Sequence, residues 1–128
     1  MSTYRVEFTE PAEAEIEAAY LSRSQFTSSV EALRWYNGLR AEILGLADWP
    51  RRCARVEATG YGYSAEIEIR RLRYGRGQVA WHVAYQVIEP AADREQNGEG
   101  IVRVLQIISA VRRPPGQKSN ARDDEDQI

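Results

Sequence analysis

Alternating apolar and polar residues open the chain, and helical spacing follows them. Tyr4, Val6 and Phe8 alternate with charged residues, and this period of two predicts a strand. Pro11 then marks a helix start, because proline is tolerated in the first turn of a helix. Apolar positions on one face predict that this helix covers about residues 12–24.

A second helix is expected directly after a short polar break. Ser28 and Glu31 have the spacing of a capping box, which predicts a helix start at Ser28. One apolar stripe follows at intervals of three and four residues: Ala32, Trp35, Leu39, Ile43 and Leu46. Pro50 ends this helix, because the residue before a proline is pushed out of the helical conformation.

The second half of the chain changes to strand patterns. A short strand is expected at residues 55–57, followed by a loop or hairpin turn that contains two glycines at residues 59–64. Residues 67–74 are a strand-forming run that carries three arginines. That run closes at the turn sequence Gly75-Arg76-Gly77.

The clearest strand covers residues 79–87, where large apolar residues alternate with small or polar ones. The large apolar set should face the core, so His82 is expected on the opposite face, exposed to a partner. A last strand is expected at residues 101–109. Both of its faces are apolar, so the pattern does not set its orientation.

The order of elements predicts an α+β domain, β-α-α-β-β-β, with two N-terminal helices packed on a small antiparallel sheet. Antiparallel pairing is expected because the late strands have short connections. The helices should cover one face of the sheet and leave the other to solvent or a partner. The domain is predicted to span residues 1–113, and the polar residues 114–128 are predicted to be a disordered tail.

Composition narrows the class of protein. A chain of 128 residues has the size of one domain. Cys53 is the only cysteine, which excludes an intrachain disulfide and disfavours a thiolate metal site. The sequence shows no secretory signal and no apolar run of membrane-spanning length, so a cytoplasmic protein without a membrane partner is expected.

Charge is distributed unevenly along the chain. Residues 1–48 hold four arginines against eight acidic residues, whereas residues 49–113 hold eleven arginines against seven. Lys118 is the only lysine, so arginine supplies almost all of the positive charge. Arginine keeps its proton and stabilises anions, but it is a poor general base.

Five segments carry a resemblance to a known family. In order they are YRVEFTEPAEAEIEAAY (Tyr4–Tyr20), LADWPRR (Leu46–Arg52), IRRLRYG (Ile69–Gly75), AWHVAYQV (Ala80–Val87) and VRVLQIISAVRR (Val102–Arg113). Together, in this order and spacing, they resemble the RelE/ParE toxin superfamily, including its plasmid-stabilisation branch. The resemblance covers about residues 3–113.

This resemblance implies the toxin of a type II toxin–antitoxin system. Such a toxin inhibits growth until the C-terminal segment of a cognate antitoxin wraps it in a hetero-oligomer. RelE-like toxins enter the ribosomal A site and cleave mRNA, whereas ParE-like toxins inhibit DNA gyrase. Neither mode implies a cofactor or a metal, and the RelE-like mode would make the chain a metal-independent endoribonuclease.

The departures from the family pattern favour the ParE-like mode. His82 stands where many relatives have an arginine, and Ser109 stands where many have a histidine. The lysines that RelE-like nucleases use are absent from residues 1–113, which hold fifteen basic and fifteen acidic residues. Two alternatives stay open: a ribosome-dependent mRNA endonuclease, and a decayed toxin that retains only antitoxin binding.

Candidate site residues follow from what RNA cleavage or target binding requires. His82 is the candidate general acid or base, with Arg73 and Tyr85 as further catalytic candidates. Residues that would contact a target phosphate or the acidic side chains of an antitoxin are Arg70, Arg71, Arg73, Tyr74, Arg76, Arg112 and Arg113. A purely structural role is the competing interpretation for His82 and for Tyr85.

Overall fold

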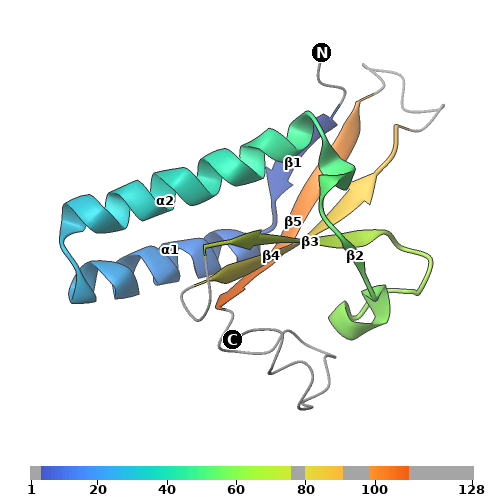
Figure 1. Cartoon of the computed structure of the whole chain (residues 1–128). Coiled ribbons are helices and arrows are strands. Elements are labelled where there is room, and N and C mark those ends of the chain that lie inside the picture. The colour runs from blue at the N-terminus through green and yellow to red at the C-terminus, as the bar shows by residue number, and fades with distance from the viewer. Residues whose placement is uncertain (1–3, 76–79, 91–98, 110–128) are drawn as a thin grey trace.

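The structure is a computed structural model that describes residues 4–75, 80–90 and 99–109. Within these ranges the chain folds into two helices and one five-stranded sheet (Figure 1). The elements follow in this order: β1 (Tyr4–Phe8), α1 (Glu10–Phe26), α2 (Ser29–Leu44), β2 (Arg55–Val56), β3 (Ile69–Tyr74), β4 (Trp81–Ile88) and β5 (Gly100–Ser109). Short 3₁₀ turns lie at Gly45–Ala47, Pro50–Arg52 and Ala58–Tyr61.

Both helices begin where the sequence places a capping residue. The Thr9 side chain accepts a hydrogen bond from the Ala12 backbone N–H, and its hydroxyl donates to the Val104 carbonyl oxygen at 2.8 Å. The Ser28 side chain accepts from the Glu31 backbone N–H at 3.1 Å, which confirms the predicted start of the second helix. That helix ends at Leu44, well before the expected stop at Pro50.

The predicted antiparallel sheet is wrong at one edge. The strand order is β1-β5-β4-β3-β2, and β1 pairs with β5 in parallel, from Tyr4 opposite Gly100 to Phe8 opposite Val104. All other pairs are antiparallel, so the sheet is mixed. Short connections enforce antiparallel pairing only between strands that are neighbours in sequence. β1 and β5 are separated by most of the domain.

One face of the sheet packs on the helices and holds the main core. The large apolar residues of β4 lie on this face, as the alternation predicts. Tyr85 and Val83 are fully buried there, between strands on both sides and α1 and α2 above. Core residues from the helices complete the layer: Ala12, Ile16, Ala19, Trp35, Leu39 and Ile43.

The opposite face of the sheet is partly covered, which corrects the expectation that it would be left open. Ala58, Ile69 and Ala84 are buried in a second, smaller apolar cluster on this face. Tyr61 and Leu105 are among the residues that pack against it. Residues 56–67 therefore act as a cover, and Figure 1 shows their turn on the side of the sheet away from α2.

None of the helices in the described ranges combines the length and the apolar character that crossing a bilayer requires.

Candidate functional site

Polar side chains gather on the covered face of the sheet. In the antiparallel register, Arg73 lies opposite His82, and Arg71 lies opposite Ala84. Ala84 in turn lies opposite Gln106 of β5. Because residues directly opposite each other share a face, these side chains form one group. We call Tyr61, Arg71, Arg73, His82 and Gln106 the polar sheet cluster.

His82 is buried, which corrects the prediction that it would be exposed. Only 4% of its surface is accessible to solvent. The alternation along β4 placed it correctly on the face away from the helices. That face is not open, however, because residues 56–67 pack over part of it and the long side chains of β3 flank the ring. His82 is polar, whereas the other buried residues of this strand are all classed as hydrophobic.

The surroundings of His82 determine which ring nitrogen carries the proton and whether the ring is charged at pH 7. An Arg73 guanidinium nitrogen, Nη1, lies 3.3 Å from the ring Nε2. A guanidinium can only donate, so Nε2 must accept and the neutral ring carries its proton on Nδ1. Burial and the positive charges of Arg71 and Arg73 lower the pKa of His82 to about 4. The ring is therefore neutral at pH 7.

Four buried polar atoms of this cluster have no hydrogen-bond partner among the described residues. They are the Tyr61 hydroxyl, Arg71 Nη1, His82 Nδ1 and Gln106 Oε1. Burial raises the pKa of Tyr61, and the positive charge of Arg71 together with the direct interaction of its guanidinium with the hydroxyl partly offsets that rise. Unsatisfied buried polar groups cost free energy, so their concentration in one place calls for an explanation.

Three other predicted site residues lie on the helix side of the sheet and do not join His82. Tyr85 is fully buried, and its hydroxyl donates to the Pro50 carbonyl oxygen at 2.6 Å. The Tyr74 hydroxyl packs so close to Gly38 of α2 that a Cβ atom there would lie 2.3 Å from it. Arg70 also lies on this side and is held by neighbours of its own.

The guanidinium of Arg70 is engaged within the fold. Its Nε donates to Glu68 at 2.7 Å, and its Nη1 donates to the Cys53 carbonyl oxygen at 2.7 Å. Glu68 also receives two hydrogen bonds from Arg51, each 2.8 Å long. Burial raises the pKa of Glu68, but the hydrogen bonds from both arginines outweigh it and lower the pKa. Arg76, Arg112 and Arg113 lie outside the described residues.

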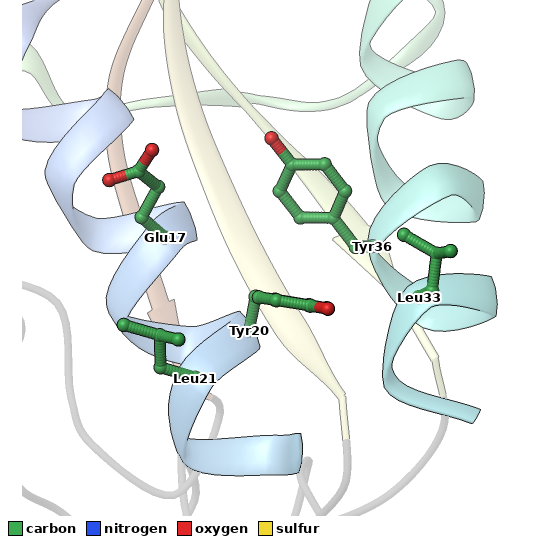
Figure 2. Close-up of a pocket in the computed structure, with 5 residues that line it drawn as sticks. All are labelled: Glu17, Tyr20, Leu21, Leu33 and Tyr36. Carbon is green, nitrogen blue, oxygen red and sulfur yellow. The ribbon is translucent and has the colours of Figure 1, made fainter. Parts of the chain in front are cut away.

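A second candidate region lies between the two helices. A pocket of about 410 Å³ opens there, and Figure 2 shows the side chains that line it: Glu17, Tyr20, Leu21, Leu33 and Tyr36. The two tyrosine rings meet edge to face, with their centres 5.4 Å apart. We call this pocket the helix groove.

The rim of the helix groove is apolar and accessible. Leu21 is 59% exposed and Leu33 is 48% exposed. Phe26 and Val30, at the end of the helical hairpin, are 82% and 63% exposed. A small domain rarely leaves such a group of large apolar side chains in water unless the surface binds something.

No group of three metal-ligating side chains comes together in the part of the chain that the structure describes. Comparison with known protein families and with curated proteins finds no match to this chain.

Sequence reasoning missed two members of the polar sheet cluster. Gln106 is the one uncharged polar residue inside an apolar strand, and that contrast was a usable signal. Tyr61 stands between two glycines in a segment that the pattern described only as a loop or turn. The two exposed leucines of the helix groove were also missed, because the helical pattern draws attention to the buried stripe.

Proposed function

We propose that this chain is a growth-inhibiting toxin that a cognate antitoxin neutralises by binding to it, as the resemblance to the RelE/ParE superfamily implies. The fold supports the proposal in its coarse features, since two helices pack on one face of a small sheet. The helix groove is the observation that carries it. Exposed apolar side chains at the mouth of a pocket indicate a protein partner.

The antitoxin is the partner we assign to the helix groove. An apolar segment of that protein would cover Leu21 and Leu33 and would insert beside the paired rings of Tyr20 and Tyr36. Removing exposed apolar surface from water contributes roughly 25 cal/mol per Å², which favours association. Glu17 on the rim would select against an acidic residue at the same point of the partner.

Inhibition by contact with a protein target, DNA gyrase in the ParE-like mode, is the mechanism we favour. A neutral, buried His82 with a pKa of about 4 cannot serve as a general acid at pH 7 and is a weak general base. Tyr85, the other candidate proton donor, lies on the opposite side of the sheet. The proposed target is therefore bound rather than chemically altered.

Ribosome-dependent cleavage of mRNA is a second candidate, and the polar sheet cluster is the observation that favours it. Arg71 and Arg73 could stabilise the phosphate group of the RNA, and His82 beside them could transfer a proton when the RNA is cleaved. A bound phosphate would also offset the positive charges that lower the pKa of His82. This route requires the His82 ring, which is only 4% exposed, to become accessible before RNA reaches it.

Growth measurements test the toxin proposal itself. Expression of the chain alone should arrest bacterial growth, and co-expression of the cognate antitoxin should restore it. A chain that arrests growth only by aggregating would not be rescued. Soluble chain at high level with unchanged growth would contradict an active toxin, and retained binding to the antitoxin would then identify a decayed one.

Two assays with purified protein separate the mechanisms. We expect the chain to inhibit DNA supercoiling by gyrase and to leave mRNA intact on translating ribosomes. His82→Gln should retain toxicity if the target is bound rather than cleaved. Loss of toxicity in this variant, together with mRNA cleavage by the wild type, would favour the nuclease instead.

A further inference from the structure

The helix groove has a carboxylate on its wall that the fold does not use. Two other glutamates of α1 are engaged: Glu13 lies 3.8 Å from a guanidinium nitrogen of Arg40, and Glu15 accepts a hydrogen bond from the Ile107 backbone N–H at 2.7 Å. Glu17 forms no ion pair or hydrogen bond with any residue that the structure describes. It is therefore available to a ligand in the groove.

The polar groups of the helix groove gather at one end. Figure 2 shows the Glu17 carboxylate and the Tyr36 hydroxyl there, while the Tyr20 ring reaches from α1 towards α2. Leu21 and Leu33 lie towards the other end. Neither tyrosine hydroxyl is hydrogen-bonded within the described ranges. The groove thus combines an end that accepts hydrogen bonds, two aromatic rings and an aliphatic end.

A purely apolar occupant would leave Glu17 unfavourably placed. Covering the groove removes water from the carboxylate, and a charged group taken out of water without a partner costs free energy. A cationic group that approaches Glu17 supplies the missing partner. The groove is therefore complementary to a segment that carries a positive charge among apolar residues.

The helices already place arginines on aromatic rings elsewhere. The guanidinium carbon of Arg40 lies 4.6 Å from the centre of the Phe8 ring and 5.7 Å from that of Tyr36. Arg23 covers Trp35 in the same way, at 5.2 Å. A guanidinium stacks well on a ring because it is flat, positive and weakly hydrated. The tyrosine rings that line the groove offer this contact to an arginine from another chain.

We propose that the helix groove binds an arginine side chain of a partner protein, with its guanidinium between Glu17 and the rings of Tyr20 and Tyr36. The fork of donors on a guanidinium suits a carboxylate together with phenol oxygens. The methylene groups of the arginine would pack on Leu21 and Leu33, as the stems of long basic side chains do on apolar surface.

A protein, and not a free cation, is the source of this group. The exposed apolar surface continues from the groove to Phe26 and Val30 at the end of the helical hairpin. A small cation would leave that surface in water, whereas apolar residues that flank an arginine in a chain would cover it. Because the antitoxin is the partner assigned to the groove, its identity here rests on the proposed function. The preference of the pocket for a cation does not.

The first test uses the full chain and a small probe, acetyl-arginine methylamide. Its matched control is acetyl-citrulline methylamide, which has nearly the same shape but no positive charge. The arginine probe should bind in the millimolar range, and the citrulline probe about tenfold more weakly. Binding is read from the NMR shifts of the Tyr20 and Tyr36 ring protons. Equal binding of the two probes, or no response of either ring, would overturn the proposal.

Two glutamate variants separate the pocket from a diffuse acidic field. Glu17→Gln should weaken binding of the arginine probe by about fivefold, because it removes the charge that pairs with the guanidinium. Glu10→Gln removes the same charge from an exposed position two turns earlier on α1, about 10 Å away, and should bind the probe as the wild type does. Thermal unfolding checks that both variants are folded. Equal losses in the two variants would contradict a defined site.

A pair of changes at Tyr20 tests the contact with the aromatic face. Tyr20→Phe keeps the ring and should bind the arginine probe nearly as well as the wild type. Tyr20→Leu keeps an apolar side chain without the ring and should bind about threefold more weakly. The same affinity in both variants would show that the guanidinium does not stack on this ring.

A comparison of two cationic probes tests whether the source is a protein. A short peptide with one arginine between leucines should bind more tightly than spermidine, a free polyamine, because the peptide also covers the exposed apolar surface. Tighter binding of spermidine would identify a free polyamine as the ligand and overturn the assignment to a protein side chain.

The antitoxin separates this inference from the proposed function. We expect the purified antitoxin to displace the arginine probe from the tyrosines. If the probe binds but the antitoxin leaves both rings unaffected, the cation pocket is supported and the assignment of the antitoxin to the groove fails. If the antitoxin perturbs both rings but the arginine probe and peptide do not bind, the assignment of the antitoxin is supported and the arginine pocket is refuted.

Discussion

The helix groove and the polar sheet cluster are opposite in character. The groove exposes apolar side chains, with Leu21 and Leu33 half in water. The cluster buries polar ones, with His82 at 4% exposure and four polar atoms without partners among the described residues. Each reverses the usual distribution of apolar groups inside and polar groups outside.

In both regions this arrangement raises the free energy of the folded chain. The kind of group that is left unfavourably placed indicates which kind of ligand would lower that free energy. Apolar surface in water is relieved by another apolar surface, which a protein supplies. Buried polar atoms without partners are relieved by a polar ligand or by water. We therefore expect the two regions to bind chemically different ligands and to respond independently to mutation.

The pH dependence of stability should give the largest effect, and it tests the buried cluster. The pKa of His82 is about 4 in the folded chain and near 6.5 when unfolded, so the unfolded chain binds the extra proton between these values. Stability should fall as the pH falls from 6.5 to 4. A shift of this size corresponds to about 3 kcal/mol.

Carboxylates with lowered pKa values, such as Glu7 and Glu89, also lose stabilising contacts in acid, so a comparison is needed. Urea unfolding of the wild type and His82→Gln, measured from pH 7 to pH 4, isolates the histidine. The wild type should lose more stability than the variant over this range. Parallel curves would show that His82 is solvated.

Antitoxin binding should give the next largest effect, and it tests the groove. Leu33→Glu places a charge in the pocket and should weaken binding of the antitoxin by about 2 kcal/mol, or roughly thirtyfold. Leu44→Glu is the matched control. Leu44 is 50% exposed on the same helix but lies about 16 Å further along it and outside the groove.

Both leucine variants should fold, since both side chains are exposed in the wild type. Calorimetry with the purified antitoxin measures the difference between them. Equal loss in Leu33→Glu and Leu44→Glu would mean that the partner covers the whole helix or that charge alone matters. Retained affinity in both would remove the groove from the account.

A charged residue beside the groove should give the smallest effect. Arg34 pairs with Glu31 at 2.9 Å, but the side chains of both residues are largely exposed. Exposed pairs of this kind contribute only about 0.3–0.5 kcal/mol. Arg34→Ala should therefore leave thermal unfolding and antitoxin affinity nearly unchanged, and a large loss of affinity would extend the binding surface beyond the apolar rim.

The sequence predicts local structure well because local structure has local causes. The alternation along residues 81–87 and the cap at Ser28 are set by neighbouring residues, and both are confirmed. The parallel pairing of β1 with β5 has no local signal, because its partners are almost a hundred residues apart. Element order gave the α+β class, but the antiparallel pairing predicted from it is wrong at that edge.

The candidate site was harder to predict because it also depends on contacts between residues that are distant in the sequence. The pattern gave the correct face for His82 but not its burial, because the pattern does not show what packs against that face. A residue's face follows from its own strand, whereas its exposure follows from whatever packs against that face. Tyr61 joins the cluster through tertiary packing alone, so no spacing in the sequence linked it to Arg71.

Growth after induction of the chain alone is the measurement that tests the central claim most directly. We expect colony counts to collapse when soluble chain accumulates, and co-production of the antitoxin to restore them. Normal growth in the presence of abundant, folded chain would contradict the claim that this protein is a toxin.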